Sequence, residues 1–372
     1  MKTVFIIAGE ASGDLHGRNL IRALRDKNPG IRIHSVGGPL MASEQPLSHI
    51  ELSHLAVTGF VGIISQLPAF LKFFQMILNK IKVIGPDGIV MIDNPGFNLR
   101  LAKRLGESEI PMVYYICPQV WAWAENRVLM MKHLFKKALV VFEFEKDIYL
   151  KYAMPVEWVG HPLKDIWQID QNSNGPKRDT GGRKRIILMP GSRQSEIEYL
   201  LPIFIKSAEI IRSEVPDVTF ELIRAETIAP RSVNKFLSRS SIPISLIEKD
   251  GKSSLRHAAL GLICSGTATL ECALAGLPMI IAYRSNALTA FIARRLIKCH
   301  ALGLPNILAK KTITPEFLQE DATPERIASE AVLILKNPGR ADEIRKQLLA
   351  SSSRLGDGHA SERAAEEILK IF

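Results

Sequence analysis

The chain has 372 residues, of which 47% are hydrophobic and 23% charged, and its formal net charge is +10. This length fits two domains, and the composition excludes a collagen, a repeat array and a disordered chain. The positive charge indicates an anionic partner: a phosphorylated small molecule, an acidic membrane surface or nucleic acid. Aromatic residues make up only 7% and no RNA-binding motif or zinc finger is present, so we expect no nucleic acid.

Targeting and redox features favour the cytoplasm. The apolar run at residues 4–8 is too short for a signal peptide, and no window reaches the roughly 18 apolar residues of a spanning helix. Four widely spaced cysteines in apolar contexts predict buried free thiols in a reducing compartment, without a zinc site. They are Cys117, Cys264, Cys272 and Cys299.

Strand-like and helix-like segments alternate along the first half, which predicts βαβ units and a parallel sheet. The strand segments are continuous apolar runs, as expected when helices cover both faces of a sheet. We predict strands at residues 4–8, 31–36, 89–92, 112–116, 138–141 and 156–159, with helices such as 17–27 and 98–105 between them.

A polar stretch at residues 168–184 has no periodicity and marks a connection to a second alternating series. The second series predicts strands at residues 186–189, 219–223, 245–247, 260–264 and 279–282. The expected α/β fold has two Rossmann-like parallel-sheet domains that face a cleft, with ligands at the carboxyl ends of strands. We place the domains at residues 1–167 and 183–340, and expect the helical segment 341–372 to pack back on the first domain.

The strand at residues 186–189 runs through Pro-Gly-Ser-Arg into a helix. A helix N-terminus has unpaired N–H groups and a positive dipole end, which together suit a diphosphate. Gly191 permits close approach to the backbone of Ser192, and Arg193 can clamp a phosphate with two hydrogen bonds. A loop before an N-capped helix explains the same residues, so this motif alone leaves both interpretations open.

A second turn of small residues, Ser265-Gly266-Thr267, follows the strand at residues 260–264. Small residues let a phosphate approach the backbone, and Glu271 further along can accept hydrogen bonds from ribose hydroxyls. The alternative is that Glu271 only complements the helix N-terminus. Two phosphate-type turns in one domain predict a nucleoside diphosphate held between them.

The first half carries carboxylates at the corresponding places. Glu10 and Asp14 follow the first strand, where a dinucleotide fingerprint would avoid negative charge. Their presence counts against an NAD enzyme and suits a sugar or acceptor site, although Ser12 or Asp14 as a helix cap is the alternative. Asp93 ends the strand at residues 89–92 and is placed to act as a general base, or else to cap the next helix.

Three further features have two interpretations each. Trp121 and Trp123 either form an apolar wall or pack in a core, and His161 is either structural or catalytic. Residues 68–81 form an apolar helix with a narrow polar stripe, which is either buried or faces lipid. We expect it to attach the protein to a membrane. The basic and apolar stretch 291–298 suits anionic head groups or a phosphorylated substrate.

Seven motifs occur in the order typical of the lipid-A-disaccharide synthases, and the chain resembles this family of inverting GT-B glycosyltransferases. The similar stretches are residues 9–14, 92–98, 119–123, 159–162, 190–193, 265–271 and 304–309. The resemblance implies transfer of sugar from UDP-2,3-diacylglucosamine to the 6-hydroxyl of 2,3-diacylglucosamine 1-phosphate. The products are UDP and the β-1,6 lipid A disaccharide 1-phosphate. It also implies peripheral association with the cytoplasmic side of the inner membrane, and a homodimer stays open.

The resemblance assigns roles to individual residues. Asp93 becomes the leading candidate for the base, Glu10 and Ser12 become catalytic candidates, and Arg193 and Asn306 fall in the substrate site. Whether Asp93 or Glu10 takes the proton stays open.

The turn after Asp93 departs from the family pattern. It usually reads Asp-Ala-Pro-Asp-Phe-Asn in the family, whereas Asn94 and Gly96 stand here, so a second carboxylate is missing. Because no DxD-like motif is evident, we expect no metal and no cofactor: cationic groups stabilise the leaving UDP, and one base serves a single displacement. The alternatives are another UDP-GlcNAc-type enzyme, such as a cell-wall glycosyltransferase or an epimerase, and a non-catalytic nucleotide-sugar binding protein.

Overall fold

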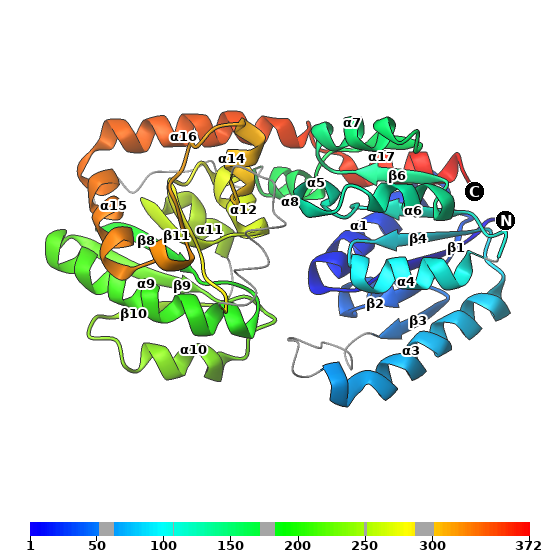
Figure 1. The fold of residues 1–372 in the computed structure, drawn as a ribbon, viewed down its shortest axis with the longest axis horizontal. Coiled ribbons are helices and arrows are strands. Elements are labelled where there is room, and N and C mark those ends of the chain that lie inside the picture. Colours follow the sequence, from blue (N-terminus) through cyan, green and yellow to red (C-terminus); the bar gives the residue numbers. More distant parts are fainter. Residues whose placement is uncertain (52–62, 107, 172–182, 249–250, 287–300) are drawn as a thin grey trace. The chain divides into compact units, whose positions relative to one another are not determined.

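The computed structural model describes residues 1–51, 63–106, 108–171, 183–248, 251–286 and 301–372. The chain divides into two compact units, one of Met1–Gln168 with Leu355–Phe372 and one of Ile169–Arg354. Each unit is built on a single parallel sheet with helices on both faces (Figure 1). The stretch 291–298, Cys299 and the side chain of Trp123 lie outside the described residues.

The sheet of the first unit has the strand order β3-β2-β1-β4-β5-β6-β7. Its strands are β1 (Thr3–Ala8), β2 (Arg32–Gly37), β3 (Ser48–Glu51), β4 (Gly88–Ile92), β5 (Met112–Tyr115), β6 (Lys137–Val140) and β7 (Val156–Trp158). Its helices are α1 (Ala11–Lys27), α2 (Pro39–Ala42), α3 (Ile63–Ile84), α4 (Pro95–Leu105), α5 (Val120–Trp123), α6 (Arg127–Leu134), α7 (Glu143–Lys151), α8 (Pro162–Gln171, which runs into the second unit) and α17 (Ala360–Leu369).

The strands of the first unit are apolar throughout because both faces of the sheet are covered. Along β1, Phe5 and Ile7 enter one buried cluster, whereas Val4 and Ile6 enter another. The first cluster includes side chains of α3, α4, α6 and α7, and the second includes side chains of α1 and α17. Alternate residues of one strand therefore serve two cores, which explains the continuous runs in the sequence.

The sheet of the second unit has the order β10-β9-β8-β11-β12-β13. Its strands are β8 (Lys184–Met189), β9 (Val218–Ile223), β10 (Ile244–Ile247), β11 (Leu260–Cys264), β12 (Met279–Tyr283) and β13 (Glu316–Leu318). Its helices include α9 (Gln194–Glu214), α10 (Pro230–Leu237), α11 (Gly251–His257), α12 (Thr267–Ala275), α14 (Leu304–Ala309), α15 (Pro324–Lys336) and α16 (Pro338–Ser352).

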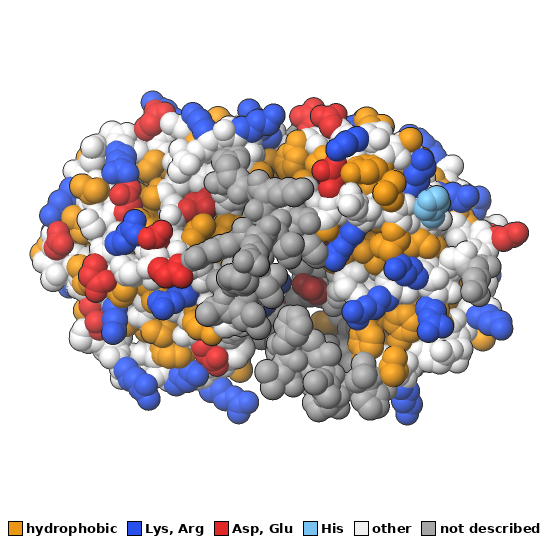
Figure 2. Space-filling model, in the orientation of Figure 1, with side chains coloured by type: hydrophobic (Ala, Val, Ile, Leu, Met, Phe, Trp, Pro, Cys, Tyr) orange, Lys and Arg blue, Asp and Glu red, His pale blue; other side chains and the backbone are white. Residues whose placement is uncertain are grey.

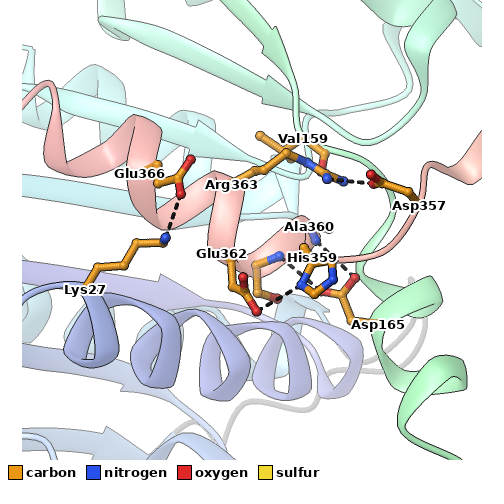
Figure 3. Close-up of polar contacts among 10 residues, drawn as sticks. Lys27, Val159, Asp165, Asp357, His359, Ala360, Glu362, Arg363 and Glu366 are labelled. Carbon is orange, nitrogen blue, oxygen red and sulfur yellow. Dashed lines mark hydrogen bonds and ion pairs between the residues drawn. The ribbon is translucent and has the colours of Figure 1, made fainter.

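The C-terminal helix α17 is fastened to the first unit by polar contacts at its start (Figure 3). The carboxylate of Asp165 accepts hydrogen bonds from the N–H groups of Ala360 and Ser361, which caps the helix. Arg363 donates to the carbonyl oxygen of Val159 at 2.8 Å. The buried side chains of Ala364, Ala365 and Ile368 add apolar packing in the second cluster.

The prediction that all of residues 341–372 packs on the first domain was wrong for residues 341–354. These residues belong to the second unit, where α16 packs against α12 and α14. Ile344 and Leu348 of α16 are buried, and they lie one helical turn apart on the same face. This apolar face holds α16 to its neighbours, so only the segment from Leu355 onward returns to the first unit.

Candidate active site

Both sheets contain a topological switch point, where neighbouring strands lead to connections in opposite directions. In the first unit it lies between β1 and β4, and in the second between β8 and β11. Ligands of open α/β sheets bind at the carboxyl ends of strands at such points. Glu10 and Asp93 follow β1 and β4, while Arg193 and Ser265 follow β8 and β11. The four turns singled out from the sequence therefore lie in two pairs, one at each switch point.

The turn after β4 has an uncommon backbone. Asp93 and Asn94 both have positive φ angles, 50° and 41°, which residues other than glycine rarely adopt. The carbonyl oxygen of Asp93 accepts hydrogen bonds from the Tyr114 hydroxyl and the Asn98 amide, both at 2.7 Å. The side chain of Asn94 accepts from the N–H of Phe97 and caps α4. The cap of α4 is therefore Asn94 and not Asp93.

Asn94 also connects this turn to the one after β1. Its amide nitrogen donates to the carbonyl oxygen of Gly9 at 3.2 Å. A Cβ atom at Gly9 would lie only 2.2 Å from that nitrogen, so the approach requires glycine. Asn94, which departs from the usual family turn, thus links the backbone turn that carries Asp93 to the one that carries Glu10.

A third left-handed residue stands at the end of the next strand. Ile116 follows β5 with φ of 57°, an outlier for a β-branched side chain. Each such residue costs about 1–3 kcal/mol and persists only where the surroundings impose it, often at functional sites. Ile116, Asp93 and Asn94 place this strain at the ends of two adjacent strands.

Glu10 and Ser12 are exposed at the switch point of the first unit, and the backbone of Glu10 forms the N-cap of α1. The alternative interpretation, in which Ser12 or Asp14 caps this helix, is wrong, because no side chain caps α1. The buried carboxylate of Asp14 instead accepts three hydrogen bonds of 2.9 Å from the start of α2. Their donors are the N–H groups of Gly38, Leu40 and Met41.

Trp121 is held in place by a buried carboxylate, Glu145, which the sequence alone did not indicate. Its indole nitrogen donates to Glu145 at 2.9 Å, and the ring packs edge-on against Phe144. The second oxygen of Glu145 accepts from the N–H groups of Val141 and Phe142 at the start of α7. Burial raises the pKa of Glu145 to about 7, against the lowering effect of these hydrogen bonds. In the sequence Glu145 stands close to the charged residues Glu143, Lys146 and Asp147, so nothing local distinguishes it as a buried carboxylate.

His161 has the arrangement of a structural histidine. Its side chain is buried, and its Nδ1 accepts from the N–H of Leu163 at 3.1 Å. Its own N–H donates to Leu355 at 2.8 Å, at the start of the returning C-terminal segment. Burial, with a smaller effect of nearby His16, lowers the pKa of His161 to about 3, so the ring is neutral at neutral pH.

In the second unit, the turn after β8 already contains an anion. Glu196 accepts from the N–H groups of Ser192 at 2.9 Å and Arg193 at 3.2 Å, and it pairs with the Arg193 guanidinium. A Cβ atom at Gly191 would lie 2.4 Å from this carboxylate. The amides of Ser192 and Arg193 are therefore engaged by the protein itself. The Arg193 side chain is 64% exposed, which makes its guanidinium the group that can reach a phosphate.

The turn after β11 presents a helix N-terminus to solvent. Gly266 is the N-cap of α12 with φ of 147°, and no side chain caps the helix. Gly266 and Thr267 are exposed, so the positive end of the helix dipole is accessible to an anion. Ser265 is fixed behind them: its N–H donates to Ala282 at 3.1 Å and its hydroxyl to Leu302 at 3.0 Å.

Glu271 and Asn306 lie deeper. Burial raises the pKa of Glu271 to about 7, and the charge of Lys252 opposes this shift. Asn306 is fully buried, and its amide makes four hydrogen bonds inside the protein. Its nitrogen donates to Thr314 and Glu316, and its oxygen accepts from Ile313 and Thr314. This pairing fills the capacity of the amide, so the geometry favours a positioning role over ligand contact.

Solved structures share the fold across nearly the whole chain. The Staphylococcus aureus protein MnaA with UDP superposes with a TM-score of 0.70 at 16% identity, covering 100% of this chain and 98% of that one. The MurG structure of Acinetobacter baumannii gives 0.57 at 15% identity, covering 100% of both chains. Together with the two parallel sheets and their switch points, these likenesses show that the protein has the GT-B fold.

A model of the family described as lipid-A-disaccharide synthetase matches residues 4–372. The chain belongs to this family, and it is a glycosyltransferase of lipid A biosynthesis. A lipid-A-disaccharide synthase of Syntrophus aciditrophicus is 37% identical over 375 residues, which cover 100% of this chain and 98% of the relative. The enzyme of that name from Neisseria meningitidis serogroup A is 38% identical, with 88% and 86% covered.

Proposed function

We propose that the chain transfers diacylglucosamine from its UDP-activated form to the 6-hydroxyl of 2,3-diacylglucosamine 1-phosphate. This forms the β-1,6 disaccharide 1-phosphate and releases UDP. The observation that carries the proposal is the chemical difference between the two switch points. One has the carboxylates of Glu10 and Asp93, and the other has the guanidinium of Arg193 and the uncapped start of α12. Carboxylates accept protons from hydroxyls, whereas guanidinium groups and helix N-termini bind phosphates.

Asp93 serves as the general base in this proposal. Its backbone is held by Tyr114 and Asn98, so the carboxylate stands on a fixed support at the end of β4. It takes the proton of the acceptor hydroxyl as that oxygen attacks the anomeric carbon, and a single displacement inverts the anomeric centre. Glu10 and Ser12, exposed at the same switch point, hydrogen-bond the acceptor sugar.

Arg193 and the α12 N-terminus stabilise the leaving UDP. Negative charge grows on the diphosphate as the glycosidic bond breaks, and fixed positive groups lower the barrier most at that stage. Gly266 lets the diphosphate approach the backbone, because its conformation admits no ordinary side chain. Glu271 accepts a hydrogen bond from the ribose. We propose that these groups serve without a metal ion.

The exposed face of α3 is the proposed membrane contact. It presents Leu71 and Met76 beside Lys72 and Lys82, in a region where apolar and basic side chains alternate on the surface (Figure 2). Such a face suits the cytoplasmic surface of an anionic bilayer. None of the helices within the described ranges is long and apolar enough to span a membrane.

Phe73 and Phe74 do not belong to that face. Both rings contact Phe97 of α4, at centroid distances of 6.3 and 5.7 Å, and pack against the first core cluster. The expectation that the apolar side chains of residues 68–81 face lipid was wrong for these two rings, because they pack against the core, whereas Lys72 and Lys82 are exposed. We expect their replacement by serine to weaken the packing of α3 on the core, so vesicle binding is better tested at Leu71 and Met76.

The test of the function is a product assay with purified protein and both acylated substrates. We expect one disaccharide 1-phosphate and one UDP per turnover, with no product when either substrate is omitted. Unacylated UDP-GlcNAc is the comparison substrate. Its turnover in place of the diacylated donor would favour a cell-wall glycosyltransferase or an epimerase and contradict the proposal.

A further inference from the structure

Glu316 lies at the start of the edge strand β13 and binds three hydrogen-bond donors. One carboxylate oxygen accepts from the N–H of Gly303 at 3.0 Å and from the Asn306 amide at 2.6 Å. The other accepts from the N–H of Leu302 at 2.9 Å. A single side chain on β13 therefore holds the segment before α14 and the first turn of that helix.

The segment that Glu316 holds is connected to the α12 turn. Leu302, which donates its N–H to Glu316, accepts the hydroxyl hydrogen bond of Ser265 with its carbonyl oxygen. Ser265 directly precedes Gly266, the N-cap of α12. At Gly303 a Cβ atom would lie 2.3 Å from Ile281, so this segment is pressed against the sheet. The chain of contacts runs from Glu316 through Leu302 to the exposed helix start.

Asn306 is part of the same arrangement. The amide donates one hydrogen to Glu316 and the other to the carbonyl oxygen of Thr314. Its oxygen is occupied by two backbone N–H groups of the loop that leads to β13. Asn306 therefore orients Glu316 and the loop on which Glu316 stands, and it acts on a ligand only through them.

We infer that Glu316 is a positioning residue of the donor site, which together with Asn306 fixes Leu302 and thereby the Ser265–Gly266 turn that receives the diphosphate. The inference rests on the proposed function, since it takes the α12 N-terminus as the UDP site. A turn fixed before binding loses little conformational entropy when UDP arrives. Without the Glu316 carboxylate, backbone donors lose their acceptor and the turn must be ordered by the ligand instead.

The variant E316Q tests the inference because it keeps the size of the side chain and removes its charge. The new NH₂ group faces a backbone N–H or the Asn306 amide, so donor meets donor. We expect the Kd for UDP and the KM for the donor to rise about tenfold, as for the loss of charge-assisted hydrogen bonds. The kcat at saturating donor and the KM for the acceptor should stay within about twofold of the unaltered protein.

This pattern separates positioning from a general structural role, which would reduce the folded fraction and lower kcat at unchanged KM. E325Q is the matched control: it alters an exposed carboxylate on α15 of the same unit and should change neither constant. S265A, measured alone and in the E316Q background, tests the connection. If Glu316 acts through Ser265, the effect of S265A shrinks in that background, whereas additive effects would overturn the inference.

A failure of the proposed function can be distinguished from a failure of the inference about Glu316. If the unaltered protein does not bind UDP, the proposed function falls. If it binds UDP and folded E316Q binds it equally well, only the role of Glu316 falls. Should E316Q not fold, E316D carries the same measurement, because it keeps the charge on a shorter side chain. We then expect an intermediate rise in the Kd for UDP, and an unchanged Kd would count against the inference.

Discussion

Both switch points present functional groups at the carboxyl ends of strands, but the backbone conformations that present them differ. At the switch point of the first unit, Asp93 and Asn94 adopt left-handed conformations that glycine would adopt at lower cost. In the second unit, Gly191 and Gly266 stand at the positions of positive φ. Strain is retained where the side chain itself is needed, and glycine is used where a ligand must approach the backbone. The difference agrees with side-chain chemistry at the first site and phosphate binding at the second.

The largest effect is expected from a substitution that disables only the first site. Asp93→Ala should lower kcat by about a thousandfold, the range of general-base catalysis, while the Kd for UDP stays unchanged. Product formation and calorimetry measure the two quantities. Asp87→Ala is the matched control, because Asp87 lies at the opposite end of the same strand and holds only the N–H of Thr3 in the contacts described. Loss of UDP binding in Asp93→Ala would contradict the assignment of catalysis to the first site and of UDP binding to the second.

Arg193→Ala should impair the second site. We expect kcat/KM for the donor to fall about a hundredfold, since a cation aimed at the leaving group is lost. Arg193→Lys should recover only part, because lysine lacks the bidentate geometry. Arg185→Ala removes an arginine at the other end of the same strand, paired with Glu221, and should leave donor kinetics intact. A normal kcat/KM in Arg193→Ala would remove the guanidinium from the donor site.

We expect the buried carboxylate of Glu145, which holds Trp121, to make the stability of the first unit depend on pH. Burial raises the folded-state pKa of Glu145 from 4.5 to about 7. The folded state then binds a proton that the unfolded state has released, so stability is highest below the ordinary pKa and falls as pH rises through 7. The neutral variant Glu145→Gln should remove this decline, which amounts to about 3 kcal/mol. Urea denaturation at several pH values measures it, and parallel pH profiles for the two proteins would show that Glu145 does not titrate there.

The smallest expected effect tests whether the backbone at Asp93 is strained. Asp93→Gly should be more stable than Asp93→Ala by about 1 kcal/mol, because glycine adopts the left-handed conformation without a Cβ clash. Both variants should lack activity, so they should differ in stability alone. Equal melting temperatures for the two variants would mean that the turn carries no strain.

The sequence predicted the central strands well because their apolar runs are continuous. All eleven predicted strands are confirmed, and no strand end differs from the prediction by more than two residues. The missed strands, β3 and β13, are edge strands without a fully buried residue, so their sequences show no such run. Helices α1 and α4 begin earlier than predicted, at Ala11 and Pro95, because their first turns contain small or turn-forming residues.

The sequence predicted the positions of candidate site residues where a turn joins a strand to a helix, but not the contacts between residues that are distant in sequence. The placement of Glu10, Asp93, Arg193 and Ser265 at strand ends followed from the alternation alone. The role of Glu316 did not, because its partners stand 10 or more residues earlier and the strand that positions it is short. Pairings of this kind depend on tertiary structure and leave no local periodicity.

The returning helix α17 has a consequence for biosynthesis. The first unit contains residues from both sides of the second, and its second core cluster includes Ala364 and Ile368. During translation the second unit therefore emerges complete while the first still lacks a helix. The N-terminal unit, usually the first to fold on the ribosome, must here wait for the C-terminal helix. Until α17 arrives, the nascent chain exposes an apolar face of the first sheet, which is the surface that a chaperone would recognise.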